Sequence, residues 1–135
     1  GDGGGAVSEF EAAPLSDRAV AASAGELNAL LGRGTRFAGK LTFEGKVRID
    51  GRFDGEVFSN GILIVGDEAE VTASVEVGTL IVRGGTVRGD VRAYAAVEVY
   101  APSRLYGSIT APEVFIDKGV VFEGNVKMTE REERP

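Results

Sequence analysis

Few side chains in this 135-residue chain could perform chemistry on a bound ligand, because it contains neither histidine nor cysteine. It therefore lacks the commonest general base and metal ligand, and also any thiolate ligand or cysteine nucleophile. Acidic residues at Asp67, Glu68 and Glu70 could attract calcium, but they lack a dedicated ligand loop. We interpret them as a solvated corner and predict no catalytic site and no metal site, so we expect a protein that is not an enzyme.

Glycine-rich segments are the other chemical candidates, since backbone amides in such loops can hold phosphate. The segments at residues 3–5 and 83–86 are not followed by the Gly-Lys-Ser/Thr of a P-loop. The tripeptide Arg88-Gly89-Asp90 resembles an adhesion motif, but its glycine belongs to a repeat described below. We therefore expect no nucleotide and no other cofactor.

The charge distribution argues against nucleic-acid and membrane partners. The net charge is −6, and residues 34–128 hold thirteen acidic and eleven basic residues, whereas residues 1–33 hold five acidic and two basic ones. No basic stripe suitable for nucleic acid is present, and an acidic leading segment does not suit an anionic membrane surface. No apolar run is long enough to span a membrane, and no secretory signal is recognisable, so we expect a cytoplasmic protein.

One five-residue phrase dominates the rest of the chain: apolar, any, glycine, any, apolar, with alanine replacing glycine once. Its six copies begin at Phe37, Phe53, Val71, Val87, Leu105 and Phe122, so successive copies start at nearly equal intervals. A fixed period of this kind is the sequence signature of a solenoid, in which each repeat buries its apolar face against its neighbours.

Apolar pairs spaced by two residues accompany each phrase, and this spacing places both side chains on one side of an extended strand. One series is Val47/Ile49, Leu63/Val65, Leu80/Val82, Val97/Val99 and Val114/Ile116; another follows each glycine. Three inward-facing segments per repeat predict an all-β fold, a single-domain parallel β-helix with triangular cross-section and about six rungs. A β-sandwich is the structural alternative, but it would not keep the period through every segment.

These signals divide the chain into a flexible N-terminal tail at 1–33, a β-helical domain at 34–128 and a flexible C-terminal tail at 129–135. Within the first tail, Leu27, Leu30 and Leu31 have helical spacing and predict one helical turn over residues 26–31. The tails are Gly-, Ala- and Ser-rich or charged, so we expect them to be disordered.

The ends and one outer column of the predicted solenoid are unusually apolar. Aromatic residues gather in the first and last rungs, and an open strand edge is a template for pairing with another chain. We predict polymer-interface residues Phe37, Leu41 and Phe43 at one end and Ile116, Phe122, Val126 and Met128 at the other. A lateral or tail-docking patch is predicted at Ile62, Ile64, Ile81 and Phe115, and the leucine turn is the favoured cover for it.

Residues 30–128 resemble a bactofilin, most specifically in the phrase Val47-Arg-Ile-Asp-Gly51 followed by Phe53-Asp-Gly-Glu-Val57. The resemblance implies a right-handed β-helix with flexible tails that forms non-polar filaments end to end without nucleotide. It also implies a cytoplasmic, bacterial cytoskeletal scaffold that positions cell-wall or chromosome-segregation proteins. Some bactofilins carry a membrane-targeting segment, but no basic-aromatic stretch here matches one, so membrane attachment is not expected.

Two alternative functions are compatible with the predicted β-helix. A monomeric β-helical adaptor would use only its outer faces and would remain near 14.1 kDa in solution. A hexapeptide-repeat transferase would also be β-helical, but such enzymes have a regular six-residue step and usually a histidine base, and this chain has neither.

Overall fold

The computed structural model describes residues 29–131, and within this range it contains ten strands and no helix. The strands are β1 (Ala29–Leu31), β2 (Arg36–Phe43), β3 (Lys46–Ile49), β4 (Arg52–Ser59), β5 (Ile62–Val65), β6 (Glu70–Val82), β7 (Thr86–Val99), β8 (Arg104–Ala111), β9 (Val114–Ile116) and β10 (Val121–Met128).

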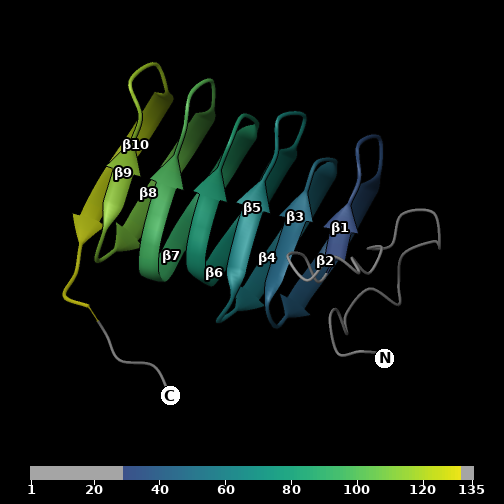
Figure 1. Ribbon diagram of the computed structural model, residues 1–135, viewed down its shortest axis with the longest axis horizontal. Helices are drawn as coiled ribbons and strands as arrows, with labels where there is room; N and C mark the ends of the chain where they lie inside the picture. Colours follow the sequence, from purple (N-terminus) through teal and green to yellow (C-terminus); the bar gives the residue numbers. More distant parts are fainter. Residues whose placement is uncertain (1–28, 132–135) are drawn as a thin grey trace.

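Every strand pairing is parallel, and each residue lies beside its counterpart in the next repeat. Phe37 pairs with Phe53, Leu63 with Leu80 and Val121 with Arg104. The chain thus winds as a β-solenoid of about six turns, with the strands side by side along the long axis (Figure 1). This confirms the predicted all-β parallel solenoid.

Each turn has three extended segments, which form three faces of the solenoid. The first face holds residues 36–38 and their counterparts, the second holds residues 40–43, and the third holds residues 46–49. The third face consists of β1, β3, β5, the C-terminal parts of β6 and β7, and β9. Loops between the third face and the next first face line one edge of the molecule (Figure 1).

The repeat glycine makes the bend between the first two faces. Gly39, Gly55, Gly89, Gly107 and Gly124 have φ between +139° and +149°, a backbone conformation that L side chains rarely adopt. A Cβ atom on Gly55 would also lie 1.8 Å from the carbonyl oxygen of Gly39 in the turn before. The glycine therefore permits both the bend and the close stacking of turns.

The inward positions of all three faces form one continuous apolar core. Phe37 and Phe53 stack with ring centroids 5.5 Å apart and an interplanar angle of 14°. The same inward column continues through Val71, Val87 and Leu105, which are buried. Among the described residues, every buried side-chain nitrogen or oxygen has a hydrogen-bond partner. The apolar core therefore contains no unpaired polar side-chain atom in this part of the chain.

The prediction of a helical turn over residues 26–31 is wrong for residues 29–31, the part of it that the structure describes. Residues Ala29–Leu31 form β1, which pairs in parallel with Val47–Ile49, and Leu31 is fully buried. A single helical turn is costly to nucleate, whereas this segment gains ladder hydrogen bonds such as Asp50 N–H to the Leu31 carbonyl at 2.7 Å. The solenoid thus begins before residue 34. Leu27, the first leucine of the expected turn, lies outside the described residues.

Candidate assembly surfaces

The C-terminal end of the solenoid exposes side chains whose counterparts in the preceding turn are buried. In the second-face column, Val91 and Ile109 are 2% and 0% exposed, whereas Val126 of β10 is 38% exposed. Met128 is 58% exposed, although its counterpart Ala111 in β8 is fully buried. The exposure arises because no further turn among the described residues covers β10.

Two more of the predicted interface residues complete this end. Phe122 and Ile116 are partly buried and pack against the core. Within the described residues, β10 pairs with β8 and β9 pairs with β7, each on one side only. Open backbone groups and apolar side chains therefore occur together here, which is the arrangement that favours pairing with another chain. We call Ile116, Phe122, Val126 and Met128 the C-terminal end surface.

The N-terminal end differs, because its predicted interface residues are enclosed. Phe37, Leu41 and Phe43 all belong to β2 and are only 4%, 0% and 7% exposed. The fold thus brings the three together in one turn, as the repeat predicts, but their side chains lie in the core. The apolar character of this end is consequently much less accessible than that of the C-terminal end.

An outward column runs along the third face and contains most of the predicted lateral patch. Strand register aligns Leu30, Arg48, Ile64, Ile81, Glu98 and Phe115. Phe115 is 48% exposed, the others are partly buried, and Ile62 lies beside Ile64 on the same face of β5. We call these six aligned residues the outer column.

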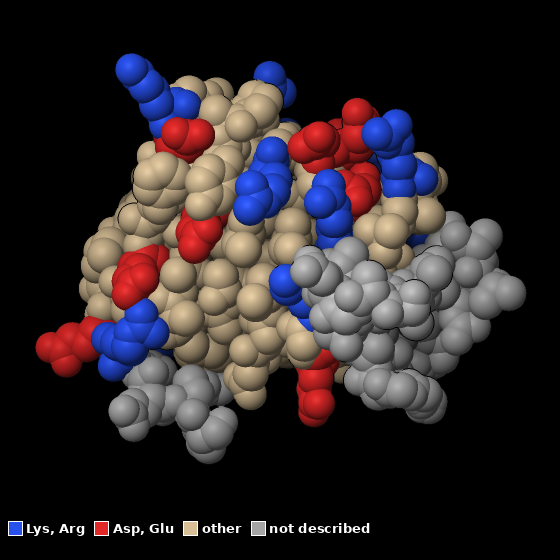
Figure 2. Space-filling view, in the orientation of Figure 1, with Lys and Arg blue, Asp and Glu red and all other residues tan. Residues whose placement is uncertain are grey.

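Uncharged residues occupy much of the middle of this face in Figure 2, whereas charged side chains gather near the loop edge. The prediction that the leucine turn covers this patch is wrong for Leu30 and Leu31, the two leucines of that turn that the structure describes. Leu31 points into the core, and Leu30 extends the outer column by one turn instead of lying over it. Sequence reasoning missed Leu30 as a member, although its spacing from Arg48 matches the interval of the repeat.

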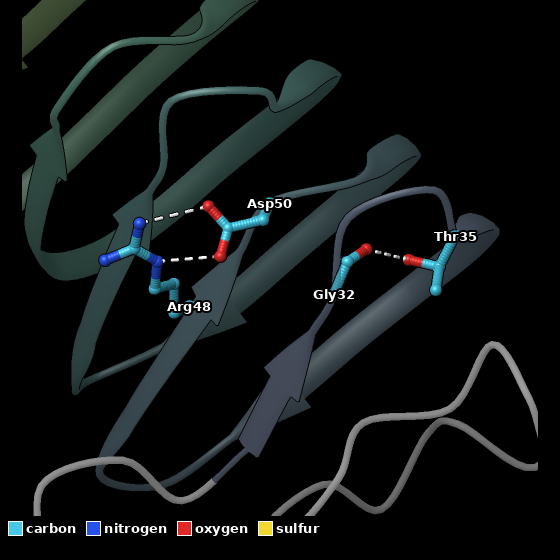
Figure 3. A network of polar contacts seen from close by, with 4 residues as sticks. All are labelled: Gly32, Thr35, Arg48 and Asp50. Carbon is cyan, nitrogen blue, oxygen red and sulfur yellow. Dashed lines mark hydrogen bonds and ion pairs between the residues drawn. The ribbon is translucent and has the colours of Figure 1, made fainter.

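Both charged members of the outer column have local partners near the loop edge. Arg48 donates from Nε and Nη2 to the Asp50 carboxylate at 2.8 and 3.1 Å, as Figure 3 shows beside the Thr35–Gly32 bond. The hydrogen bond to Asp50 raises the pKa of Arg48. The Tyr100 hydroxyl donates to Glu98 Oε1 at 2.7 Å, and this bond raises the pKa of Tyr100. Tyr100 also contacts the Phe115 ring, with centroids 5.4 Å apart.

The motifs considered for ligand chemistry that lie within residues 29–131 have structural explanations, and the glycines at residues 3–5 lie outside the described residues. Gly85 is buried, and a Cβ atom there would lie 2.4 Å from the Ala69 carbonyl oxygen, so this glycine allows two turns to stack. Gly89 of the adhesion-like tripeptide is a bend glycine. Across residues 29–131, no group of three or more acidic side chains is arranged to hold a metal ion. The same residues include no helix of the length and apolarity needed to cross a bilayer.

Comparison with known proteins agrees with this architecture. The bactofilin family model, described as polymer-forming cytoskeletal, matches residues 29–127, so its match begins at the first residue of β1. Bactofilin BacP of Myxococcus xanthus (strain DK1622) is 35% identical over 109 residues, which cover 81% of this chain and 45% of BacP. Bactofilin BacO of the same organism is 29% identical over 105 residues, covering 78% of this chain and 82% of BacO.

No solved structure matches the chain. The family match spans all ten strands except the last residue of β10, and it confirms the resemblance carried by the Val47–Gly51 and Phe53–Val57 phrases. The chain belongs to the bactofilin family of polymer-forming cytoskeletal proteins.

Proposed function

We propose that this protein is a cytoskeletal scaffold whose solenoids assemble end to end into filaments without nucleotide. The observation that carries the proposal is the C-terminal end surface, where Val126 and Met128 are exposed although their counterparts Ile109 and Ala111 in β8 are fully buried. Another molecule stacked on β10 would cover them as the next turn covers Ile109 and Ala111. Contacts that repeat without closing produce a filament.

The driving force of such a contact resides in the protein itself. Burying an apolar side chain of the size of Val, Met or Phe contributes about 1.5–3 kcal/mol, and the open edge of β10 adds backbone hydrogen bonds. Phe122, Val126 and Met128 lie on one strand, so a single contact can bury all three. Because this free energy is available without a chemical step, we expect assembly to require neither ATP nor GTP.

The N-terminal end completes the proposed interface through Phe37, Leu41 and Phe43. These side chains are buried. In a contact at this end they would therefore act chiefly by packing beneath β2 and keeping it in place, and they would touch the neighbouring molecule only if the end rearranged. We place the filament in the bacterial cytoplasm, where its outer faces would position cell-wall or chromosome-segregation proteins. The family supports self-association, and these client proteins and this location are part of our proposal.

The test is Phe122→Arg, which places a cation within the C-terminal end surface. A guanidinium buried there without a partner costs about 3–5 kcal/mol, which weakens each contact more than about 100-fold. We expect wild-type protein to sediment as filaments without nucleotide and the variant to stay in the supernatant. Circular dichroism should show β structure in both, because Phe122 is only partly buried in the last strand.

Phe58→Arg is the matched control, since it makes the same substitution at a residue that is 43% exposed on an outer face. It should sediment like the wild type. Sedimentation of Phe122→Arg at the wild-type level would exclude the C-terminal end surface as an interface. A wild-type mass near 14.1 kDa by light scattering would instead favour the monomeric adaptor.

A further inference from the structure

The outer column has the same chemical order from either end: apolar, charged, apolar, apolar, charged, apolar. Its members are Leu30, Arg48, Ile64, Ile81, Glu98 and Phe115, one from each successive turn. The two charges have opposite signs and lie at mirrored positions, each one turn from an end of the column. A surface with this order is complementary to its own reverse.

We propose that two copies of this protein pair laterally and antiparallel through their third faces. A two-fold axis parallel to the strands reverses the order of the turns but keeps each position along a strand, so the column meets itself reversed. Arg48 then faces the partner's Glu98, and Ile64 faces the partner's Ile81. Leu30 faces the partner's Phe115. Each charge thus occurs twice in the interface with an opposite charge across from it.

The parallel arrangement is disfavoured by the same residues. A two-fold axis along the solenoid would keep the turns level, so the Arg48 turn of one copy would face the Arg48 turn of the other. Positions along the strand are reversed about that axis, so Arg48 would meet the partner's Arg48 and, three turns on, Glu98 would meet the partner's Glu98. Like charges set against each other across an interface cost several kcal/mol and are a common means of excluding a wrong orientation.

Hydrogen-bonding capacity is available at both charged positions. Arginine has five N–H donors, and the Asp50 carboxylate engages only Nε and Nη2 of Arg48, which leaves Nη1. Glu98 accepts from Tyr100 at Oε1, and Oε2 has no hydrogen-bond partner among residues 29–131. Asp50 follows Arg48 by two residues, and Tyr100 follows Glu98 by two residues. Both pairs therefore lie where the third face leads into the loops. The antiparallel two-fold brings the loop edges of the two copies together.

The neighbouring column on the third face is compatible with the same pairing. It contains Lys46, Ile62, Thr79 and Ala96 in successive turns. Reversal sets Lys46 against the partner's Ala96 and Ile62 against the partner's Thr79. No like charges meet in these pairs, and the small Ala96 side chain leaves room for the longer Lys46.

The contact is a narrow strip, about 24 Å long if six turns are spaced by about 4.8 Å. A strip of this size gives a weak pair when molecules are separate, and repetition along a filament strengthens it through avidity. The pairing does not depend on how the ends of the solenoid associate, so its test is independent of the end-to-end proposal.

Cross-linking tests the orientation, because the chain has no native cysteine and an introduced thiol is unique. Lys46→Cys and Ala96→Cys proteins, one of them size-tagged, are mixed and treated with a bismaleimide spanning about 10 Å, the separation of packed sheets. We expect the mixed species to be cross-linked and neither variant to be cross-linked with itself. Self-linking of either variant, or absence of the mixed species, would overturn the proposal.

Charge reversal tests the contact itself. Glu98→Arg sets two arginines against each other and should reduce the mixed cross-linked yield at least about tenfold. Glu56→Arg, an equal charge change at an exposed second-face residue, should leave the yield unchanged. The Arg48→Glu, Glu98→Arg double variant should recover it, with folding checked by circular dichroism. A yield unaffected by Glu98→Arg, or reduced equally by Glu56→Arg, would refute the pairing.

Discussion

Replacing Gly107 by alanine tests how tightly the turns of this solenoid are stacked. Gly107 is the bend glycine of β8 and has φ of +142°. A Cβ atom there would lie 1.9 Å from the Gly89 carbonyl oxygen in the turn before. Real Cβ atoms are not found closer than 3.0 Å to such an atom, so β8 must move away from β7 or the bend must change its backbone angles.

The cost can be estimated from these two effects. A non-glycine residue in a sparsely populated backbone region costs about 1–3 kcal/mol, and forcing an extra methyl group into a packed interior costs typically about 1–3 kcal/mol. Together they destabilise the fold by roughly 2–6 kcal/mol. The contacting atom belongs to the backbone, so no side-chain rotation can relieve the contact, and we expect the upper half of this range.

Urea denaturation followed by circular dichroism measures the change in the free energy of unfolding. It is best made in the Phe122→Arg background, so that assembly does not contribute to stability. Gly32→Ala is the matched control, since Gly32 has no atom within 4 Å of a built Cβ and no positive φ. If Gly107→Ala lowers stability by no more than the control does, the stacking argument for the repeat glycine is refuted.

The remaining predictions concern the core and the outer column. Phe53→Ala should destabilise the fold by about 3–5 kcal/mol, measured in the same denaturation assay, because Phe53 is fully buried against Phe37; a loss below about 1 kcal/mol would contradict this packing. Glu98→Gln should lower the pKa of Tyr100 in a phenolate absorbance titration, because Glu98 raises that pKa; an unchanged titration, equal to that of Glu56→Gln, would contradict the contact. Sedimentation of Phe122→Arg and cross-linking of Glu98→Arg test the two assembly surfaces.

The fold could be predicted because every turn repeats the same short sequence motif. The phrase around Gly55, with Phe53 and Val57 on either side, specifies one bend and two inward side chains, and six copies leave little choice of architecture. Where no repeat supported the pattern, local periodicity misled. The spacing of Leu27, Leu30 and Leu31 predicted a helical turn, but pairing with β3 makes Ala29–Leu31 a strand.

The candidate surfaces were only partly predictable, because exposure depends on the neighbouring turn. Phe43 and Met128 occupy equivalent positions in the first and last turns, and both were predicted as interface residues. The structure leaves Phe43 only 7% exposed but Met128 58% exposed. The sequence pattern at the two positions is the same, so nothing in the pattern distinguishes the end with buried side chains from the end with exposed ones.

The sequence by itself determined the period, the inward apolar columns, the bends and the family of this protein, because the same motif recurs in every turn and its copies can be aligned without the structure. The tertiary structure alone decided which end exposes its apolar side chains and where the outer column begins. The repeat already aligns Arg48, Ile64, Ile81, Glu98 and Phe115, but only the pairing of β1 with β3 adds Leu30 and so places the two charges at mirrored positions. Strand register places residues that are one repeat apart in the sequence side by side on one face. The chemistry of a surface depends on which residues are neighbours there.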